Sequence, residues 1–333
     1  MGENANNHAQ PFRVGDRGLT SRQARKYRRL LRGVYVDAST DPTALVMAKA
    51  ARVHSRGLGV LGGRSAAAAL GTRYLDQRRR RHPDDRRPTP QRSRYREHDR
   101  TRFEYFDPEP PVLIRPRSAS MRSPQGLVTA GLDLPGDEVV LARGMRVTSP
   151  ARTAFDIGRW PASALPGWAP DSDRDFERRL ILLDALCNAT KLTVPEIRAV
   201  ADRHPRAGGL SRLREVLPHV DGKAESPPET RLRLLITGHG LPRPDAQVPV
   251  SNEYGVQIAH VDLGWPQWCV GAEYDGDWHW EDEVQRPIDI ARYADYESAG
   301  WDVLRVEKSL LNKTPAVIIG ELEARLRRAG ANV

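Results

Sequence analysis

The feature of this chain that most constrains its fold is the stretch 261–279, in which acidic residues follow two apolar runs. Asp262 ends the first run, and Glu273 and Asp275 end the second run, eleven residues further on. Apolar runs of this length predict adjacent strands, so three carboxylates come together and repel one another at pH 7. A stable fold tolerates such a cluster with a cation, a shared proton or enough water. A divalent metal held by oxygen ligands is the commonest reason to build one.

The predicted site follows from a hairpin reading of these two runs. Asp262 and Glu273 then converge, and Asp275, two residues beyond Glu273, projects to the same face. Mg²⁺ or Mn²⁺ bound there would polarise a phosphodiester and lower the pKa of an attacking water. His279 would act as base or acid, or would hydrogen-bond a phosphate. Glu229, one helix earlier, would complete the metal shell of Asp262 and Glu273. The alternative is an exposed acidic loop without function.

Glu229 also has a purely structural explanation. Ser226 is a natural N-cap, Pro227 suits the first helical position, and Glu229 follows three residues after the cap, which together make a capping box. Beyond this helix the sequence predicts three strands, a helix over 288–298, a strand over 301–306 and a closing amphipathic helix over 314–328. The expected order of the last domain is therefore α-β-β-β-α-β-α.

Charge is distributed unevenly along the 333 residues. The chain carries a formal net charge of +9. Residues 76–102 hold eleven Arg against five acidic residues, whereas residues 225–333 hold eleven Lys and Arg against eighteen Asp and Glu. This division predicts a basic part that meets nucleic acid and an acidic part that holds metal. The sequence has no secretory signal and no long apolar run, and its two cysteines have no metal-ligand spacing. These features predict a cytoplasmic protein with reduced, buried thiols and no membrane partner.

The N-terminal part predicts a basic helix over 22–31 that ends at Gly33, followed by a strand over 33–37. A basic helix beside a β-wing is typical of a winged-helix DNA reader. Arg25, Arg28 and Arg29 are its predicted phosphate contacts. The alternative is a solvated basic helix face.

The remaining elements divide the chain into three parts. Residues 1–158 form a mixed α+β domain, with a loosely ordered Arg-rich insertion at 76–102. Residues 159–222 form a linker and a helical segment, and residues 223–333 form the last domain. The helices and strands expected in the first two parts cover residues 42–57, 60–71, 112–116, 126–130, 138–142, 145–149, 149–158, 175–188, 193–203 and 209–217.

The last domain resembles a known family. Its motifs SPPET, HVDLGWP, VGAEYDGDWH and GWDVLRV are similar, in order and spacing, to those of actinobacterial proteins with a Vsr-like, restriction-endonuclease-like domain. The resemblance implies a PD-(D/E)xK nuclease fold over 226–330. By position, Glu229 matches the first-helix acid, Asp262 the central metal-binding acid and Glu273 the acid of the E-x-K element. His279 matches the histidine that follows the third strand.

Two further correspondences complete this resemblance. Asp289 and Arg292 match the polar pair on the helix after the third strand. Asp275 departs from the wider superfamily, in which many members have lysine at this place. That lysine normally orients the water, so its absence leaves the mechanism open and keeps a binding-only descendant as an alternative.

The N-terminal half resembles AbiEi-type antitoxins or transcriptional regulators of type IV toxin–antitoxin systems. The motifs are RRLLRGVYV, GRSAAAALG and GMRVTSPARTAFDIG, over roughly residues 13–160. Together the two resemblances imply a metal-dependent DNA endonuclease or nuclease-like DNA-processing protein. The rival hypotheses are a non-catalytic DNA-binding regulator with a degenerate nuclease fold, and a defence component that acts with a partner protein. Cutting both strands of DNA needs two sites, which favours a homodimer.

Overall fold

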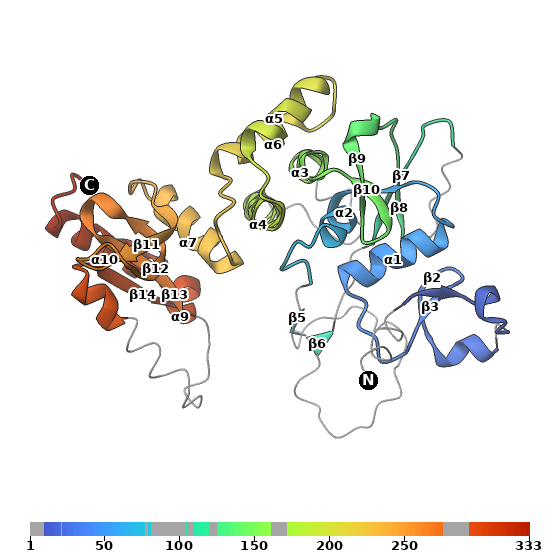
Figure 1. Cartoon of the computed structure of the whole chain (residues 1–333), viewed down its shortest axis with the longest axis horizontal. Helices are drawn as coiled ribbons and strands as arrows, with labels where there is room; N and C mark the ends of the chain where they lie inside the picture. The colour runs from blue at the N-terminus through green and yellow to red at the C-terminus, as the bar shows by residue number, and fades with distance from the viewer. Residues whose placement is uncertain are drawn as a thin grey trace. The chain divides into compact units, whose positions relative to one another are not determined.

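A computed structural model shows a mixed α/β protein, which confirms the expected α+β class (Figure 1). The structure describes residues 10–20, 22–76, 79–80, 104–105, 110–119, 125–160, 172–275 and 293–333. The chain divides into two compact units. Unit 1 comprises Met1–Pro170 and Pro195–Ser211, and unit 2 comprises Asp171–Val194 and Arg212–Val333.

Unit 1 is organised around a five-stranded mixed sheet of order β8-β7-β4-β10-β9. The pairs β4–β7 and β9–β10 are antiparallel, whereas β7–β8 and β4–β10 are parallel. The strands expected in this region are confirmed as β7 (Val112–Arg115), β8 (Val128–Gly131), β9 (Val139–Ala142) and β10 (Met145–Thr148). The sequence predicts a turn into a helix over 60–71, but the first residues of this segment form the short strand β4 (Val60–Leu61). The short pair β5 (Arg79–Arg80) and β6 (Glu104–Tyr105) forms a separate ribbon.

The helices of this unit begin where the sequence places its caps. Thr43 caps α1 (Ala44–His54), and Ser149 caps α3 (Pro150–Arg159), each through a side-chain oxygen that accepts a backbone N–H. The Ala-rich α2 (Gly63–Ala69) packs closely, as expected from its small residues. A Cβ at Gly62 would lie 2.6 Å from Ile114, so only glycine fits there without a shift. The close approach of Ile114 explains why glycine occupies this position.

The expected N-terminal helix over 22–31 is wrong. The short η1 (Gly15–Arg17) and η2 (Gln23–Lys26) are followed by a small antiparallel sheet of order β1-β3-β2. Its strands are β1 (Phe12–Arg13), β2 (Arg28–Leu31) and β3 (Val34–Val36). A register shift between Arg29 and Leu31 turns Leu31 inward beside Val34, and both join the core with α1. Burial of these apolar residues outweighs the helical spacing of the arginines.

The short η3 (Gly136–Glu138) lies between β8 and β9 in unit 1. Further along the chain, between the strands of the two sheets, lie α4 (Ser172–Thr190), α5 (Val194–Arg203) and α6 (Leu210–Val216), with η5 (Leu217–His219) continuing α6. The three α-helices confirm the predicted ones. The segment 159–222 contributes α4 to unit 2 and α5 to unit 1. In α4, Leu180, Leu183 and Leu186 are fully buried on one side, as the 3.6-residue period requires.

Unit 2 contains a four-stranded sheet of order β11-β12-β13-β14. The first three strands are antiparallel, and β14 is parallel to β13. The strands are β11 (Asp245–Ser251), β12 (Gln257–Trp265), β13 (Val270–Asp275) and β14 (Asp302–Glu307). The other elements are α7 (Pro227–Gly238), η6 (Pro266–Trp268), a helix over 293–298, α9 (Lys308–Lys313) and α10 (Pro315–Arg328).

Helices pack on both faces of this sheet and form two apolar clusters. Leu232 of α7 and Leu322 of α10 pack with Leu263 on one face, whereas Tyr296 packs with Val250 and Val261 on the other. No helix in the described part of the chain has the length and apolar character needed to span a bilayer.

The two cysteines differ in burial. Cys187 is buried as expected, whereas Cys269 is half-buried, because it follows η6 in a left-handed turn (φ 50°) at the edge of the domain core.

Candidate functional site

Asp262 lies where β12 changes the face to which it turns its side chains. In a regular strand, residues two apart face the same side, so Val261 and Leu263 would share a face. Leu263 instead packs in the cluster with α7 and α10, whereas Val261 packs in the cluster with Tyr296. A Cβ at Gly271 would meet Val261 at 2.6 Å, which places Val261 on the side opposite Leu263.

The neighbouring strand has a matching irregularity at Gln247. This residue has φ 52°, a left-handed conformation that is unusual within a strand. The regular pairs Ala246–Leu263 and Val248–Val261 lie on either side of it. At this level of the sheet, the side chains of both strands switch from one face to the other. The irregularity leaves the Asp262 side chain outside the two apolar clusters that cover these faces.

Asp262 and Glu273 lie opposite each other, one position beyond the last regular pair between β12 and β13. That pair is Leu263–Ala272, so Asp262 and Glu273 are the next residues on their strands. The Oδ2 atom of Asp262 accepts a 2.9 Å hydrogen bond from the backbone N–H of Tyr274. The carboxylate of Asp262 thereby bridges the two strands where their backbone ladder ends. The structure places Asp262 and Glu273 at adjacent strand positions, as the hairpin predicted.

Glu273 is buried, with 4% of its surface exposed, and it is held by Tyr296. The Tyr296 hydroxyl contacts Oε1 of Glu273 and lies 2.7 Å from the carbonyl oxygen of His260, so its one hydrogen is available to either acceptor. Tyr296 is itself 1% exposed and comes from the helix over 293–298. One buried hydroxyl thus connects β12, β13 and this helix and fixes the orientation of the Glu273 side chain. The sequence predicted the helix but not this residue, because a tyrosine on an apolar helix face gives no separate signal.

Asp275 and Glu229 have structural partners. Asp275 forms an ion pair with Arg305 of β14, in which the Arg305 Nε donates to Oδ2. Glu229 lies in the expected cap: the Ser226 hydroxyl accepts its N–H at 3.4 Å. The Oε2 atom of Glu229 accepts from the N–H of Glu225 at 2.9 Å and from Nε2 of Gln247 at 3.0 Å.

Burial of Glu229 raises the pKa of its carboxyl group, and the hydrogen bonds from its neighbours oppose this effect only in part. The Gln247 contact links the first turn of α7 to the irregularity at Asp262, so the three acids Glu229, Asp262 and Glu273 belong to one connected region of unit 2.

The donor set at the point where β12 and β13 stop pairing has the chemistry that a hard divalent cation prefers. Asp262 and Glu273 supply carboxylate oxygens from adjacent strands, and each carboxylate is oriented by a protein donor. Among the described residues, no group of three or more His, Cys, Asp or Glu side chains is arranged to hold a metal. His279, Asp289 and Arg292 lie outside the described residues.

The predicted nucleic-acid contacts lie in unit 1, on a short 3-10 helix and the strand that follows it, and not on one α-helix. Arg25 lies in the last turn of η2, and Arg28 and Arg29 begin β2. Arg25 and Arg29 are exposed, whereas Arg28 is half-buried and donates to the carbonyl oxygen of Thr40 at 2.7 Å. Arg25 and Arg29 are therefore available for phosphates, and Arg28 also has a structural contact.

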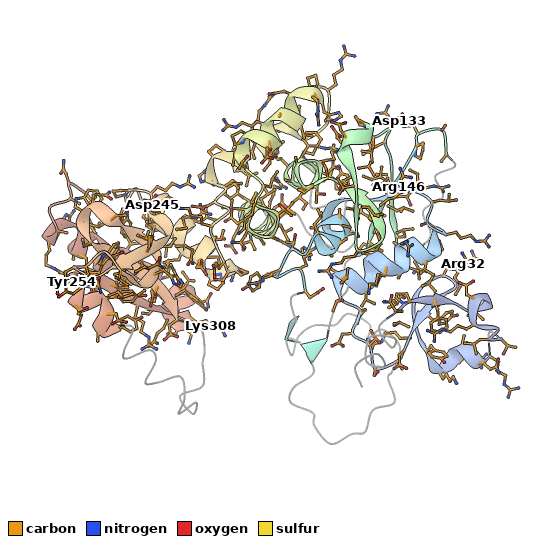
Figure 2. The ribbon with its side chains drawn as sticks, viewed as in Figure 1. Arg32, Asp133, Arg146, Asp245, Tyr254 and Lys308 are labelled. Carbon is orange, nitrogen blue, oxygen red and sulfur yellow. The ribbon has the colours of Figure 1, made fainter. Side chains whose placement is uncertain are left out.

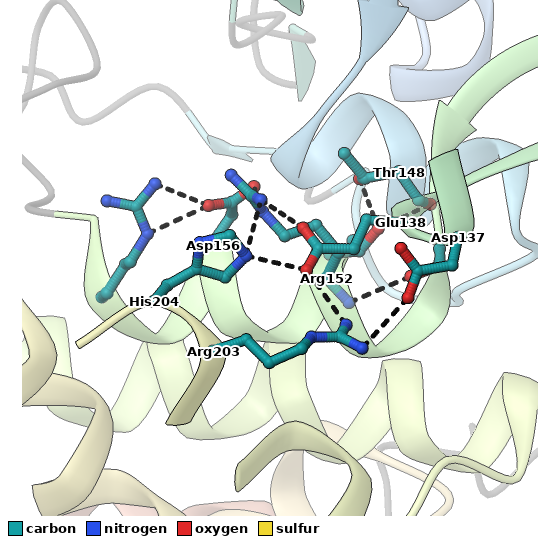
Figure 3. A network of polar contacts seen from close by, with 10 residues as sticks. Asp137, Glu138, Thr148, Arg152, Asp156, Arg203 and His204 are labelled. Atoms are coloured by element: carbon teal, nitrogen blue, oxygen red, sulfur yellow. Dashed lines mark hydrogen bonds and ion pairs between the residues drawn. The ribbon is translucent and has the colours of Figure 1, made fainter. Parts of the chain in front are cut away.

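Unit 1 contains a buried ionic network that the sequence did not reveal (Figure 3). Arg152 is 3% exposed and lies between two buried carboxylates: it donates to Glu138 and, from Nε, to Asp156 at 2.9 Å. Nε2 of His204 lies 2.7 Å from Oε1 of Glu138, and Nη2 of Arg203 lies 3.0 Å from the same oxygen.

Arg159 completes this network by contacting Asp156 at 2.7 Å. The helical spacing of Arg152, Asp156 and Arg159 is visible in the sequence. Glu138 and His204 are 66 residues apart, and only the fold brings them together.

Comparisons with known proteins give relatives without an assigned activity. No family model matches the chain, and no solved structure matches it. Two uncharacterized proteins of Mycobacterium tuberculosis, from strains CDC 1551 / Oshkosh and ATCC 25618 / H37Rv, are each 32% identical over 187 residues. The match covers 56% of this chain and 62% of each relative. The chain thus spans less than two thirds of the length of these relatives.

Proposed function

We propose that this protein is a metal-dependent DNA endonuclease that hydrolyses phosphodiester bonds, with unit 2 as a Vsr-like, restriction-endonuclease-like PD-(D/E)xK domain. The observation that carries the proposal is the placement of Asp262 and Glu273 at adjacent positions where β12 and β13 stop pairing. A sheet with helices on both faces holds this pair, and each acid is oriented by a separate donor.

Asp262 and Glu273 would hold Mg²⁺ or Mn²⁺. When bound, the cation would act as a Lewis acid on the phosphate and would lower the pKa of a water. The Tyr274 N–H keeps the Asp262 carboxylate pointing across the strands, and Tyr296 keeps the Glu273 carboxylate in place. Preorganised carboxylates reduce the reorganisation that binding a cation would require. In this proposal Glu229 supports the site through Gln247, Asp275 positions Arg305, and His279 serves as the acid or base.

DNA would be held by the basic residues of the N-terminal half. Arg25 and Arg29 are exposed there, and the segment 76–102 adds eleven arginines. Phosphate contacts of this kind supply sequence-independent affinity that falls with salt. The acidic last domain would gain little affinity for DNA by itself, so the two parts of the chain divide binding and hydrolysis between them.

A second candidate function is a non-catalytic DNA-binding regulator, and two specific contacts favour it. Asp275 is paired with Arg305, and Glu229 is a helix-capping residue. Both acids therefore have a structural reason to be present, which leaves Asp262 and Glu273 as the part of the acidic set that the regulator hypothesis does not explain.

Nicking of supercoiled plasmid by the purified full chain separates these functions. The endonuclease predicts nicked product with Mg²⁺ or Mn²⁺ and none with EDTA. A gel shift of the same plasmid in EDTA gives the matched binding measurement. Binding without nicking in either metal, on duplex, nicked and single-stranded substrates alike, would overturn the enzyme and leave the regulator.

A further inference from the structure

The outer face of the three-stranded sheet in unit 1 combines aromatic rings with positive charge. Phe12 and Arg29 are both register partners of Tyr35, so the three residues form one row across the sheet. Directly paired residues project to the same face. Leu31 and Val34 turn to the other face and pack in the core with α1. The row of Phe12, Tyr35 and Arg29 therefore faces away from that core, and we call this side the outer face.

Phe12 forms the floor of the outer face, and only 6% of it is exposed. The Tyr27 ring lies 4.9 Å from the Phe12 ring and nearly perpendicular to it, and the Tyr35 ring lies 6.5 Å away. Arg17 places its guanidinium carbon 3.8 Å from the centre of the Phe12 ring, and Lys26 places Nζ 5.4 Å from that of Tyr27. Tyr27 and Tyr35 are half-buried, so each is fixed by packing and still presents ring surface.

The charge around these rings is strongly positive. Residues 12–36 hold eight Arg and Lys residues against a single acid, Asp16. Arg32 lies at the turn between β2 and β3 (Figure 2). The exposed cations of this segment are Arg17, Arg22, Arg25, Lys26, Arg29 and Arg32. A surface with many cations and rigid aromatic side chains is complementary to a nucleic acid whose bases are unpaired and accessible.

We propose that the outer face binds single-stranded DNA, with bases stacked on Tyr27 and Tyr35 and phosphates contacted by Arg17, Lys26 and Arg29. The proposal rests on DNA being the partner in the proposed function, and it names the form of that DNA. Duplex DNA hides the faces of its bases, so a surface made for duplex would need the cations but would gain nothing from the tyrosines. Unpaired bases can stack on the tyrosines while their phosphates contact the cations.

Binding of fluorescent 20-nucleotide poly(dT) to the full chain in EDTA tests this proposal without any cleavage. Tyr35→Leu keeps an apolar side chain against Phe12 but removes the ring, and Tyr35→Phe keeps the ring. We expect Tyr35→Leu to weaken binding about tenfold, since stacking on one aromatic ring contributes on the order of that factor. Tyr35→Phe should stay within about twofold of the unchanged protein. Thermal unfolding of each variant checks that the fold is retained.

Charge and strand form are tested with the same assay. Arg29→Gln should weaken poly(dT) binding and reduce the salt slope by about 0.7, the contribution of one phosphate contact in a single strand. The matched control is Arg198→Gln, which removes an exposed charge from α5 in the same unit and should change nothing. Unchanged affinity in Tyr35→Leu, or equal affinity for poly(dT) and a 20-base-pair duplex, would overturn the proposal.

Failure of this inference is distinguishable from failure of the proposed function. Plasmid nicking uses metal and depends on unit 2, whereas the poly(dT) measurement uses EDTA and depends on the outer face. Nicking with no effect of Tyr35→Leu on poly(dT) binding would remove only the inference. Ring-dependent poly(dT) binding without nicking of any substrate would remove only the endonuclease.

Discussion

The carboxylate of Asp262 accepts the backbone N–H of Tyr274 at 2.9 Å, across the point where β12 and β13 cease to pair. A side-chain oxygen thus takes the place of a backbone carbonyl in the ladder. This contact brings Asp262 beside Glu273, the residue that precedes Tyr274. The contact needs only one acceptor oxygen, so asparagine at position 262 can preserve it while removing the charge. The Asp262→Asn variant therefore tests the chemistry of this site without removing the contact that supports the fold.

Tyr296→Phe removes the hydroxyl that contacts Glu273 without changing the ring. We expect a loss of about 1–3 kcal/mol in the free energy of unfolding, because a buried polar group loses its partner. The nicking rate should fall more than substrate binding does, since Glu273 loses its fixed orientation. Urea unfolding and nicking kinetics measure the two effects. Tyr254→Phe is the control, because Tyr254 is 80% exposed at the β11–β12 turn (Figure 2). Equal behaviour of the two variants would contradict the role assigned to Tyr296.

Arg152→Met leaves Glu138 and Asp156 buried without their shared cation. Breaking a buried ion pair on one side typically costs about 3–5 kcal/mol. We therefore expect the transition of unit 1 to move to lower temperature by calorimetry. Arg146→Met removes an exposed arginine from β10 and should change stability by less than about 0.5 kcal/mol. A loss below about 1 kcal/mol for Arg152→Met would contradict its central role and show that Arg159, Arg203 and His204 suffice for the two acids.

The pH dependence of unit 1 should depend on Glu138. Burial by itself raises the pKa of this carboxyl group, but hydrogen bonds from His204 and Arg152 and their charges outweigh burial and hold the pKa below its usual range. A lowered pKa stabilises the folded state above the unfolded pKa of about 4.5, and this stabilisation is lost as pH falls through the folded pKa.

The test compares the unchanged protein with Glu138→Gln by urea unfolding at pH 7 and pH 4. The difference in free energy of unfolding between the two proteins should shrink as the pH is lowered, because glutamine has no charge to lose. A difference that is constant over this range would mean that Glu138 does not titrate in folding.

Gly209→Ala tests the packing of the loop between α5 and α6. Gly209 has φ 85°, and a Cβ there would lie 2.0 Å from the carbonyl oxygen of Arg159. The added methyl group both strains the backbone and collides with backbone atoms, so we expect a loss of at least about 1–3 kcal/mol. Gly208→Ala is the neighbouring control, since nothing lies within 4 Å of the position that its methyl group would take. Similar melting temperatures for the two variants would contradict this explanation of the loop.

Local sequence signals predicted those parts of the fold that depend on local chemistry. Ser149 and Pro150 indicated the start of α3, and Ser226 with Pro227 indicated the start of α7. The helix expected over 22–31 failed because a bulge at β2 lets Leu31 join a core made from α1, and this competition is not visible in the spacing of the arginines.

The sequence predicted the acidic residues of the candidate site but not the residues that orient them. The hairpin predicted from the two apolar runs places Asp262 and Glu273 on adjacent strands, as observed, but Asp262 lies inside β12 and not at its end as predicted. The face change at Asp262 depends on the left-handed conformation of Gln247, and no glycine marks that position. Tyr296 is 23 residues from Glu273, so its contact depends on tertiary packing.

The most direct test of the central claim is the metal-dependent nicking rate of Asp262→Asn beside that of Asp245→Asn. Asparagine at 262 can still accept the Tyr274 N–H, so the fold should persist, whereas Asp245 is an exposed acid at the start of β11. We predict that Asp262→Asn loses at least about a hundredfold in rate while keeping its unfolding temperature, and that Asp245→Asn nicks as the unchanged protein does. Nicking by a folded Asp262→Asn at the unchanged rate would contradict the claim that Asp262 and Glu273 form the reaction centre.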